Sequence, residues 1–149
     1  MSLLCLALLL ALWLHRKTHH ILQFAFALLA GMSMSWIVKI VVQLPRPEGG
    51  LIPETGYSFA SGHAAMAVIF FFLIAYSYKS HVKSRVLRTL FIVANACLAL
   101  AIGFSRIYLG VHYATDVLFG FLIGLVVSAL SVIVLQSYER RHPVIESKR

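Results

Sequence analysis

Long apolar runs separated by short polar segments dominate the pattern of the chain. Four runs have the length and composition of helices that cross about 30 Å of hydrocarbon, and the second, which is the shortest, is expected to begin one turn earlier at Ser61. They are Ile21–Leu44, Ala64–Tyr78, Val86–Phe104 and Ala114–Leu135. The runs lack the alternation of a strand, and a helix satisfies its backbone polar groups internally. The pattern predicts an all-α, polytopic transmembrane bundle.

A fifth apolar run, Leu3–Leu14, has only 12 residues. As a helix it would reach about 18 Å, which is too short to span the hydrocarbon. No basic segment precedes it and no small-residue cleavage site follows it, so a signal peptide is not favoured. Two interpretations stay open: a short interfacial helix, or the remnant of a longer N-terminal part. We expect one membrane-embedded domain over residues 1–149.

Composition supports the membrane assignment, because 60% of the 149 residues are hydrophobic and only 12% are charged. A soluble domain of this size needs more polar surface to cover its core. Both cysteines, Cys5 and Cys97, lie inside apolar runs without the spacing of a metal site. We interpret them as small buried hydrophobic residues.

The formal net charge of +8 would also suit a nucleic-acid-binding protein. The basic residues, however, lie in short segments between the apolar runs, which favours membrane lipids over nucleic acid as partners. Ten of the 13 fall on one side of the predicted bundle: Arg16, Lys17, Lys79, Lys83, Arg85, Arg88, Arg140, Arg141, Lys148 and Arg149. The positive-inside rule places that side and the C-terminus in the cytoplasm. Loops Pro45–Phe59 and Ser105–His112 then share the opposite face, together with Lys39, Arg46 and Arg106.

A lysine and an arginine flank the end of the first span. Lys39 lies about one turn before that end, and Arg46 follows in the loop. Each alone is typical of a side chain reaching for the membrane interface. Together they place an ammonium and a guanidinium beside one bend, a pairing that suits phosphate oxygens.

The sequence Ser61-Gly62-His63 stands where a polar loop meets the second span. The first turn of a helix offers unpaired N–H groups to an anion, and Gly62 allows close approach of the backbone. The alternative is a serine N-cap followed by an incidental histidine.

His112 and Asp116 have the i, i+4 spacing of one helix face, provided that the helix has begun by His112. A carboxylate behind an imidazole fixes its tautomer and leaves the other nitrogen free to attack. Arg106, expected in the same loop, adds a third cation. A structural His–Asp pair is the alternative. So many cations would repel a metal ion, and the pattern favours an anion at the centre.

The three motifs, Lys-x6-Arg-Pro, Ser-Gly-His and Ser-Arg-x5-His-x3-Asp, lie in this order over Lys39–Asp116. Their order and spacing resemble the type 2 phosphatidic acid phosphatase superfamily. The resemblance implies that His112 attacks phosphorus to form a phosphohistidine, that Asp116 orients it, and that His63 protonates the leaving oxygen. It also implies that no metal or other cofactor is needed and that five residues hold the phosphoryl oxygens: Lys39, Arg46, Ser61, Gly62 and Arg106.

The amino-acid sequence around the motifs is similar to that of bacterial members acting on undecaprenyl diphosphate or phosphatidylglycerol phosphate. We therefore expect a lipid phosphatase of the bacterial inner membrane with its site outside the cytoplasm. Undecaprenyl diphosphate is favoured as the substrate over phosphatidylglycerol phosphate and phosphatidic acid. The family usually has proline where this chain has Ala60, which should loosen the start of the following helix. It also commonly has six spans, whereas this chain shows four and a fragment, and the missing part would lie before the first motif.

Three alternatives remain open from the sequence. The phosphoryl group could pass to another lipid instead of water, which would make the chain a phosphotransferase. The chain could also be a non-catalytic lipid-binding membrane protein, although a scaffold needs none of the candidate catalytic residues. Gly120 and Gly124 form a Gly-x3-Gly pair that suits either a dimer or close packing within one chain, and the oligomeric state stays open.

Overall fold

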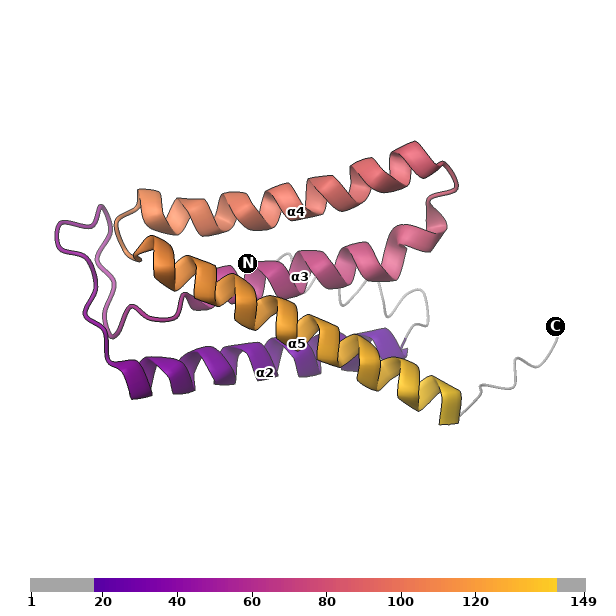
Figure 1. Ribbon diagram of the computed structural model, residues 1–149, viewed down its shortest axis with the longest axis horizontal. Helices are drawn as coiled ribbons and strands as arrows, with labels where there is room; N and C mark the ends of the chain where they lie inside the picture. The colour runs from indigo at the N-terminus through magenta and orange to yellow at the C-terminus, as the bar shows by residue number, and fades with distance from the viewer. Residues whose placement is uncertain (1–17, 142–149) are drawn as a thin grey trace.

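The computed structural model describes residues 18–141, which form an up-and-down bundle (Figure 1). Its elements are α2 (Thr18–Val42), α3 (Gly62–Tyr78), the 3₁₀ turn η1 (Lys79–His81), α4 (Arg85–Tyr108) and α5 (Ala114–Arg141). Each of the four α-helices is long and apolar enough to cross a membrane. The predicted all-α bundle with four spans is confirmed, and the apolar run at residues 3–14 lies outside the described part of the chain.

The helix boundaries matter for the site at two places, and at the first of them they correct the sequence prediction. Helix α4 continues to Tyr108, so Arg106 lies in its last turn and not in a loop. Helix α5 begins at Ala114, where the predicted apolar run begins, so His112 precedes the helix and the condition attached to its i, i+4 spacing with Asp116 is not met. The predicted start of the second span is confirmed to within a residue, because Ser61 is the N-cap of α3.

Helix α3 lies at the centre of the bundle and packs against α2, α4 and α5. The core joins buried apolar side chains of α2, α3 and α5: Phe24, Ala27, Ala65, Ile69, Phe70, Leu73, Ile123 and Val127. Helix α4 buries one stripe of small residues at i, i+4 and i+8, namely Asn95, Ala99 and Gly103. Its other faces are apolar and exposed, as expected of a helix whose solvent is lipid. They include Cys97, which was predicted to be buried.

Two glycines of α5 allow it to lie directly against α3. A Cβ on Gly120 would collide with the carbonyl oxygen of Ser61, and one on Gly124 would lie 2.7 Å from the carbonyl oxygen of Ala65. The Gly-x3-Gly pair therefore serves packing within the chain, which was one of the two interpretations left open by the sequence. This close approach sets the start of α3 beside the first turns of α5.

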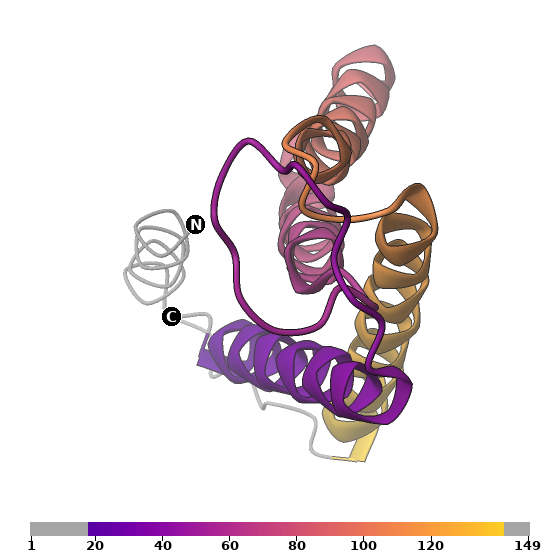
Figure 2. The same cartoon turned by 90° about the vertical axis from the view of Figure 1, so that its left-hand side faces the viewer.

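The loop of residues 43–61 and the short connection of residues 109–113 meet at one end of the bundle, as predicted (Figure 2). The backbone N–H of Leu51 donates to the carbonyl oxygen of Leu109 at 2.9 Å. A Cβ on Gly50 would lie 2.9 Å from the carbonyl oxygen of Gly110, so the two backbones approach closely, and Gly110 has a φ of +67°, which favours glycine. The loops thereby assemble a single surface from three separate parts of the sequence.

Candidate active site

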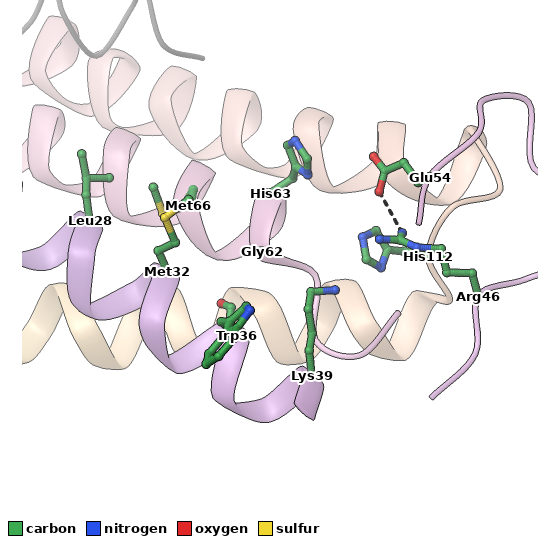
Figure 3. A pocket seen from close by; sticks show the side chains of 11 residues that line it. Leu28, Met32, Trp36, Lys39, Arg46, Glu54, Gly62, His63, Met66 and His112 are labelled. Atoms are coloured by element: carbon green, nitrogen blue, oxygen red, sulfur yellow. Dashed lines mark ion pairs between the residues drawn. The ribbon is translucent and has the colours of Figure 1, made fainter. Parts of the chain in front are cut away.

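A cavity of about 450 Å³ opens at this end of the bundle, between α2, α3 and the two loops. Figure 3 shows that its lining is divided: charged and imidazole side chains gather at the loop end, and Leu28, Met32 and Met66 line the part deeper between the helices. The loop end is formed by Lys39, Arg46, Glu54, His63 and His112. The cavity therefore has a polar end and an apolar end, as an amphiphilic ligand requires.

Lys39 lies in the last turn of α2, and its ammonium reaches the long loop. Its Nζ donates to the carbonyl oxygen of Tyr57 at 2.6 Å and to that of Ser58 at 3.1 Å. An ammonium has three N–H donors. Lys39 thus holds the loop in place and keeps one donor for another acceptor in the cavity.

Arg46 joins the two loops. Its guanidinium donates to three carbonyl oxygens, those of Gly56 at 3.2 Å, Thr55 at 3.2 Å and Val111 at 2.9 Å. Nη1 of Arg46, which donates to Val111, also lies 2.9 Å from a carboxylate oxygen of Glu54. These bonds fix the planar guanidinium at the wall of the cavity, so its orientation is set before any ligand arrives.

Glu54 lies between two of the predicted phosphate-binding cations. One of its oxygens pairs with Arg46, and the other lies 3.8 Å from Nη1 of Arg106. A carboxylate with two guanidinium partners has the charge and hydrogen-bonding pattern of a bound oxyanion. Sequence reasoning did not single out this residue, because a glutamate in a polar loop has no signal of its own.

The start of α3 presents the Ser-Gly-His motif to the cavity. The hydroxyl of Ser61 is fully buried and accepts from the N–H of Ala64 at 3.4 Å, as the N-cap alternative anticipated. Gly62 and His63 line the cavity, and the His63 ring is exposed there. The structure therefore separates the motif into one capping residue and two residues that line the cavity.

His112 is buried at the inner wall of the cavity, with only 3% of its surface exposed. Its Nδ1 lies 3.4 Å from Oδ2 of Asp116, a side chain that is completely buried. The same carboxylate oxygen accepts from the N–H of Tyr113 at 2.9 Å, and the Ser58 hydroxyl also donates to it. Asp116 thereby caps the start of α5 and fixes the His112 ring at the same time.

Burial lowers the pKa of His112 below its ordinary value of 6.5, and the positive charges of Lys39 and Arg46 lower it further. The hydrogen bond to Asp116 and its negative charge act in the opposite direction. The net effect favours the neutral imidazole near neutral pH. A neutral ring has a free lone pair on one nitrogen, as a nucleophile needs.

The structure brings the predicted site residues together at one end of the bundle. Five of the eight line the cavity: Lys39, Arg46, Gly62, His63 and His112. The other three stand behind it, with Ser61 capping α3, Asp116 fixing His112, and Arg106 bound to Glu54. Ser58, which also contacts Asp116, was missed because only the folded loop brings it there.

Comparison with known proteins identifies the family of the chain. The sequence model of the PAP2 superfamily matches residues 20–140, and the chain belongs to this superfamily. Phosphatidylglycerophosphatase B of Bacillus subtilis (strain 168) is 33% identical over 117 residues, which are 76% of this chain and 57% of that protein. The chain thus spans little more than half the length of this relative.

Two solved structures share the fold. The crystal structure of a transmembrane PAP2 type phosphatidylglycerolphosphate phosphatase from Bacillus subtilis superposes with a TM-score of 0.79 at 27% identity, covering 100% of this chain and 74% of that one. The crystal structure of Aquifex aeolicus LpxE gives 0.70 at 26% identity, covering 89% and 78%. With its four apolar spans, the chain is a multi-pass membrane protein of the PAP2 fold.

Proposed function

We propose that the chain is an integral membrane lipid phosphatase that uses His112 as its nucleophile. The observation that supports this most directly is the placement of His112, which lines a cationic cavity while its Nδ1 faces a buried carboxylate. Nδ1 then holds the proton and Nε2 is the atom that attacks. The apolar end of the cavity suits the chain of a lipid.

In the proposed reaction, Nε2 of His112 attacks phosphorus and the bond from phosphorus to the leaving oxygen breaks. His63 donates a proton to that oxygen, so the lipid leaves as an alcohol or a monophosphate. Water, deprotonated by His63, then attacks phosphorus and breaks the N–P bond to release inorganic phosphate. Lys39, Arg46 and Arg106, with Gly62 at the start of α3, stabilise the charge on the phosphoryl oxygens, and no metal ion takes part.

The substrate class follows from the shape of the cavity and from the relatives. A phosphoryl group fits the loop end, and the deeper wall of Met32, Met66 and Leu28 accepts a hydrocarbon chain. The names of the Bacillus subtilis relative and of the Bacillus subtilis crystal structure point to phosphatidylglycerol phosphate. The sequence around the motifs is similar to members that act on undecaprenyl diphosphate or phosphatidylglycerol phosphate. We propose that the substrate is a lipid with a terminal phosphate or diphosphate. The three candidate substrates are phosphatidylglycerol phosphate, undecaprenyl diphosphate and phosphatidic acid.

Release of inorganic phosphate from the three lipids in detergent, with EDTA present, tests the function. Wild type should release phosphate from at least one lipid, and His112→Ala should not. His81→Ala, which removes an exposed histidine at the other end of the bundle, should match wild type. Absence of release from every lipid, or equal release by His112→Ala, contradicts the enzyme. Activity that is lost in EDTA and restored by a divalent ion contradicts the metal-free mechanism. Transfer of the phosphoryl group to an added lipid alcohol identifies a phosphotransferase.

We also propose that the site lies on the extracytoplasmic face of a bacterial inner membrane. The basic residues at the opposite end of the described bundle support this: Lys79, Lys83, Arg85, Arg88, Arg140 and Arg141. A single cysteine at exposed position 48 (Glu48→Cys), with Cys5 and Cys97 replaced by serine, should react with an impermeant maleimide on intact cells. Labelling only after lysis would reverse the orientation.

A further inference from the structure

The cavity has a polar group on its wall that the proposed mechanism does not use. Among the described residues, three buried serine hydroxyls have no hydrogen-bond partner: those of Ser35, Ser77 and Ser128. Of these, Ser35 lines the cavity. Its side chain on α2 is 3% exposed, so bulk water does not satisfy its hydroxyl.

Ser35 marks the border between the two ends of the cavity. It lies one helical turn before Lys39, which corresponds to about 6 Å along the axis of α2. Met32 and Leu28 continue the same face of the helix toward the apolar end. On the opposite wall stands the start of α3, because a Cβ on Gly62 would be 4.0 Å from that of Ser35.

A buried hydroxyl without a partner is unfavourable, and the alternatives within the chain are not used. A serine in a helix can donate to a carbonyl oxygen one turn earlier, but Ser35 makes no such bond. Alanine at this position would complete the apolar wall without that cost. A ligand oxygen at this depth would satisfy the hydroxyl.

The path of a lipid substrate supplies such an oxygen. Its phosphoryl group lies among the cations at the loop end, and its chain must run toward the apolar end. The atoms that pass Ser35 are therefore those within a few bonds of the phosphorus. In a diphosphate these include the second phosphate, and in a glycerol lipid they include ester or hydroxyl oxygens. A simple alkyl phosphate has only methylene groups there.

We propose that Ser35 determines specificity by donating a hydrogen bond to an oxygen of the leaving group about one helical turn from the transferred phosphorus. This inference rests on the proposed phosphatase function. It assigns Ser35 to substrate selection and not to the chemical step. The enzyme then prefers diphosphates and glycerol lipids to alkyl phosphates of equal hydrophobicity.

The test compares Ser35→Ala with Ser77→Ala and Ser128→Ala, which remove the same kind of unpartnered hydroxyl away from this cavity. Each variant is assayed on phosphatidic acid, undecaprenyl diphosphate and dodecyl phosphate. For Ser35→Ala we expect kcat/KM to fall about 3- to 10-fold on phosphatidic acid, which corresponds to the loss of one neutral hydrogen bond. It should fall by at least as much on undecaprenyl diphosphate, where the acceptor is a charged phosphate oxygen, and stay unchanged on dodecyl phosphate. The two control variants should leave all three values unchanged. An equal loss on all three substrates, or no loss, overturns the proposal while the phosphatase function stands.

A binding measurement keeps the proposal testable without turnover. Trp36 lines the cavity, and Trp13→Phe leaves it as the only tryptophan of the chain. Titration of its emission compares the phosphonate analogue of phosphatidic acid with dodecylphosphonate. Ser35→Ala should weaken binding of the first ligand about 3- to 10-fold and not of the second. Equal affinities of wild type and Ser35→Ala for both ligands overturn the proposal even if no lipid is hydrolysed.

Discussion

His112 and Asp116 face each other through Nδ1 and Oδ2 at 3.4 Å, although His112 stands two residues before the first residue of α5. The connection before α5 places the imidazole over the first turn, where the carboxylate also accepts the N–H of Tyr113. The position of the nucleophile and the start of the helix are therefore fixed by one side chain.

Asp116→Asn should lower kcat by about 10²- to 10⁴-fold, because an amide can present a donor to Nδ1 and favour the wrong tautomer. Phosphate release under saturating lipid measures this loss. Thr115→Ala, at an exposed neighbouring position, is the matched control and should keep nearly full activity. Folding is checked by thermal unfolding in detergent, since Asp116 also caps α5. An active and folded Asp116→Asn variant would remove Asp116 from the mechanism.

The pH profile should report the lowered pKa of His112. Attack needs the neutral imidazole, so kcat/KM rises as pH increases through this pKa, and the rise should be centred below 6.5. Burial is the main cause of the shift and Lys39 the next. Lys39→Met should therefore raise the pKa and move the rise to higher pH, whatever the loss in rate. Lys83→Met, exposed at the other end of the bundle, should not move it. A shift to lower pH in Lys39→Met would contradict the assignment.

Glu54→Gln should make orthovanadate a stronger inhibitor by about 3- to 10-fold. The carboxylate competes with an incoming oxyanion for Arg46 and Arg106, and the partial exposure of these groups keeps the effect modest. Inhibition curves for phosphate release give the comparison. Glu48→Gln removes an exposed carboxylate from the same loop and should leave the inhibition unchanged. Weaker inhibition of Glu54→Gln would mean that Glu54 chiefly holds the arginines in place.

Gly120→Ala should destabilise the bundle by about 1–3 kcal/mol, because the new methyl group meets the carbonyl oxygen of Ser61 and the side chain of Ala64. Thermal unfolding in detergent measures the change. Activity should fall as well, since the start of α3 would move away from α5. Leu118→Ala, on an exposed face of the same helix, is the control and should have a small effect. Wild-type stability and activity in Gly120→Ala would contradict the close approach of the two helices.

Hydropathy alone predicted the four spans, because a helix in lipid must be apolar over a fixed length. The distribution of basic residues predicted that Lys39, Arg46, His63 and His112 share one membrane face, and the family resemblance implied that they form one site. All four line one cavity. Their catalytic and binding roles stay predictions until they are measured.

Other features depended on the folded loops. Ser58 reaches Asp116, and Glu54 reaches two arginines, only because the loop of residues 43–61 folds back over the bundle. An irregular loop has no periodic pattern from which such a path can be predicted. The start of α5 matches the start of the predicted apolar run at Ala114. The i, i+4 spacing of His112 and Asp116 does not reflect a shared helix, because a turn before the helix brings the two side chains equally close.

The central claim is a covalent phosphohistidine at His112, and trapping it is the most direct test. Wild type is mixed with a lipid labelled with ³²P in its terminal phosphate and denatured in alkali within a single turnover, which preserves an N–P bond. We predict acid-labile label on the peptide that contains His112 and none on His112→Ala. Label on another residue, or turnover by wild type with no trapped phosphoenzyme at any time point, would contradict the account.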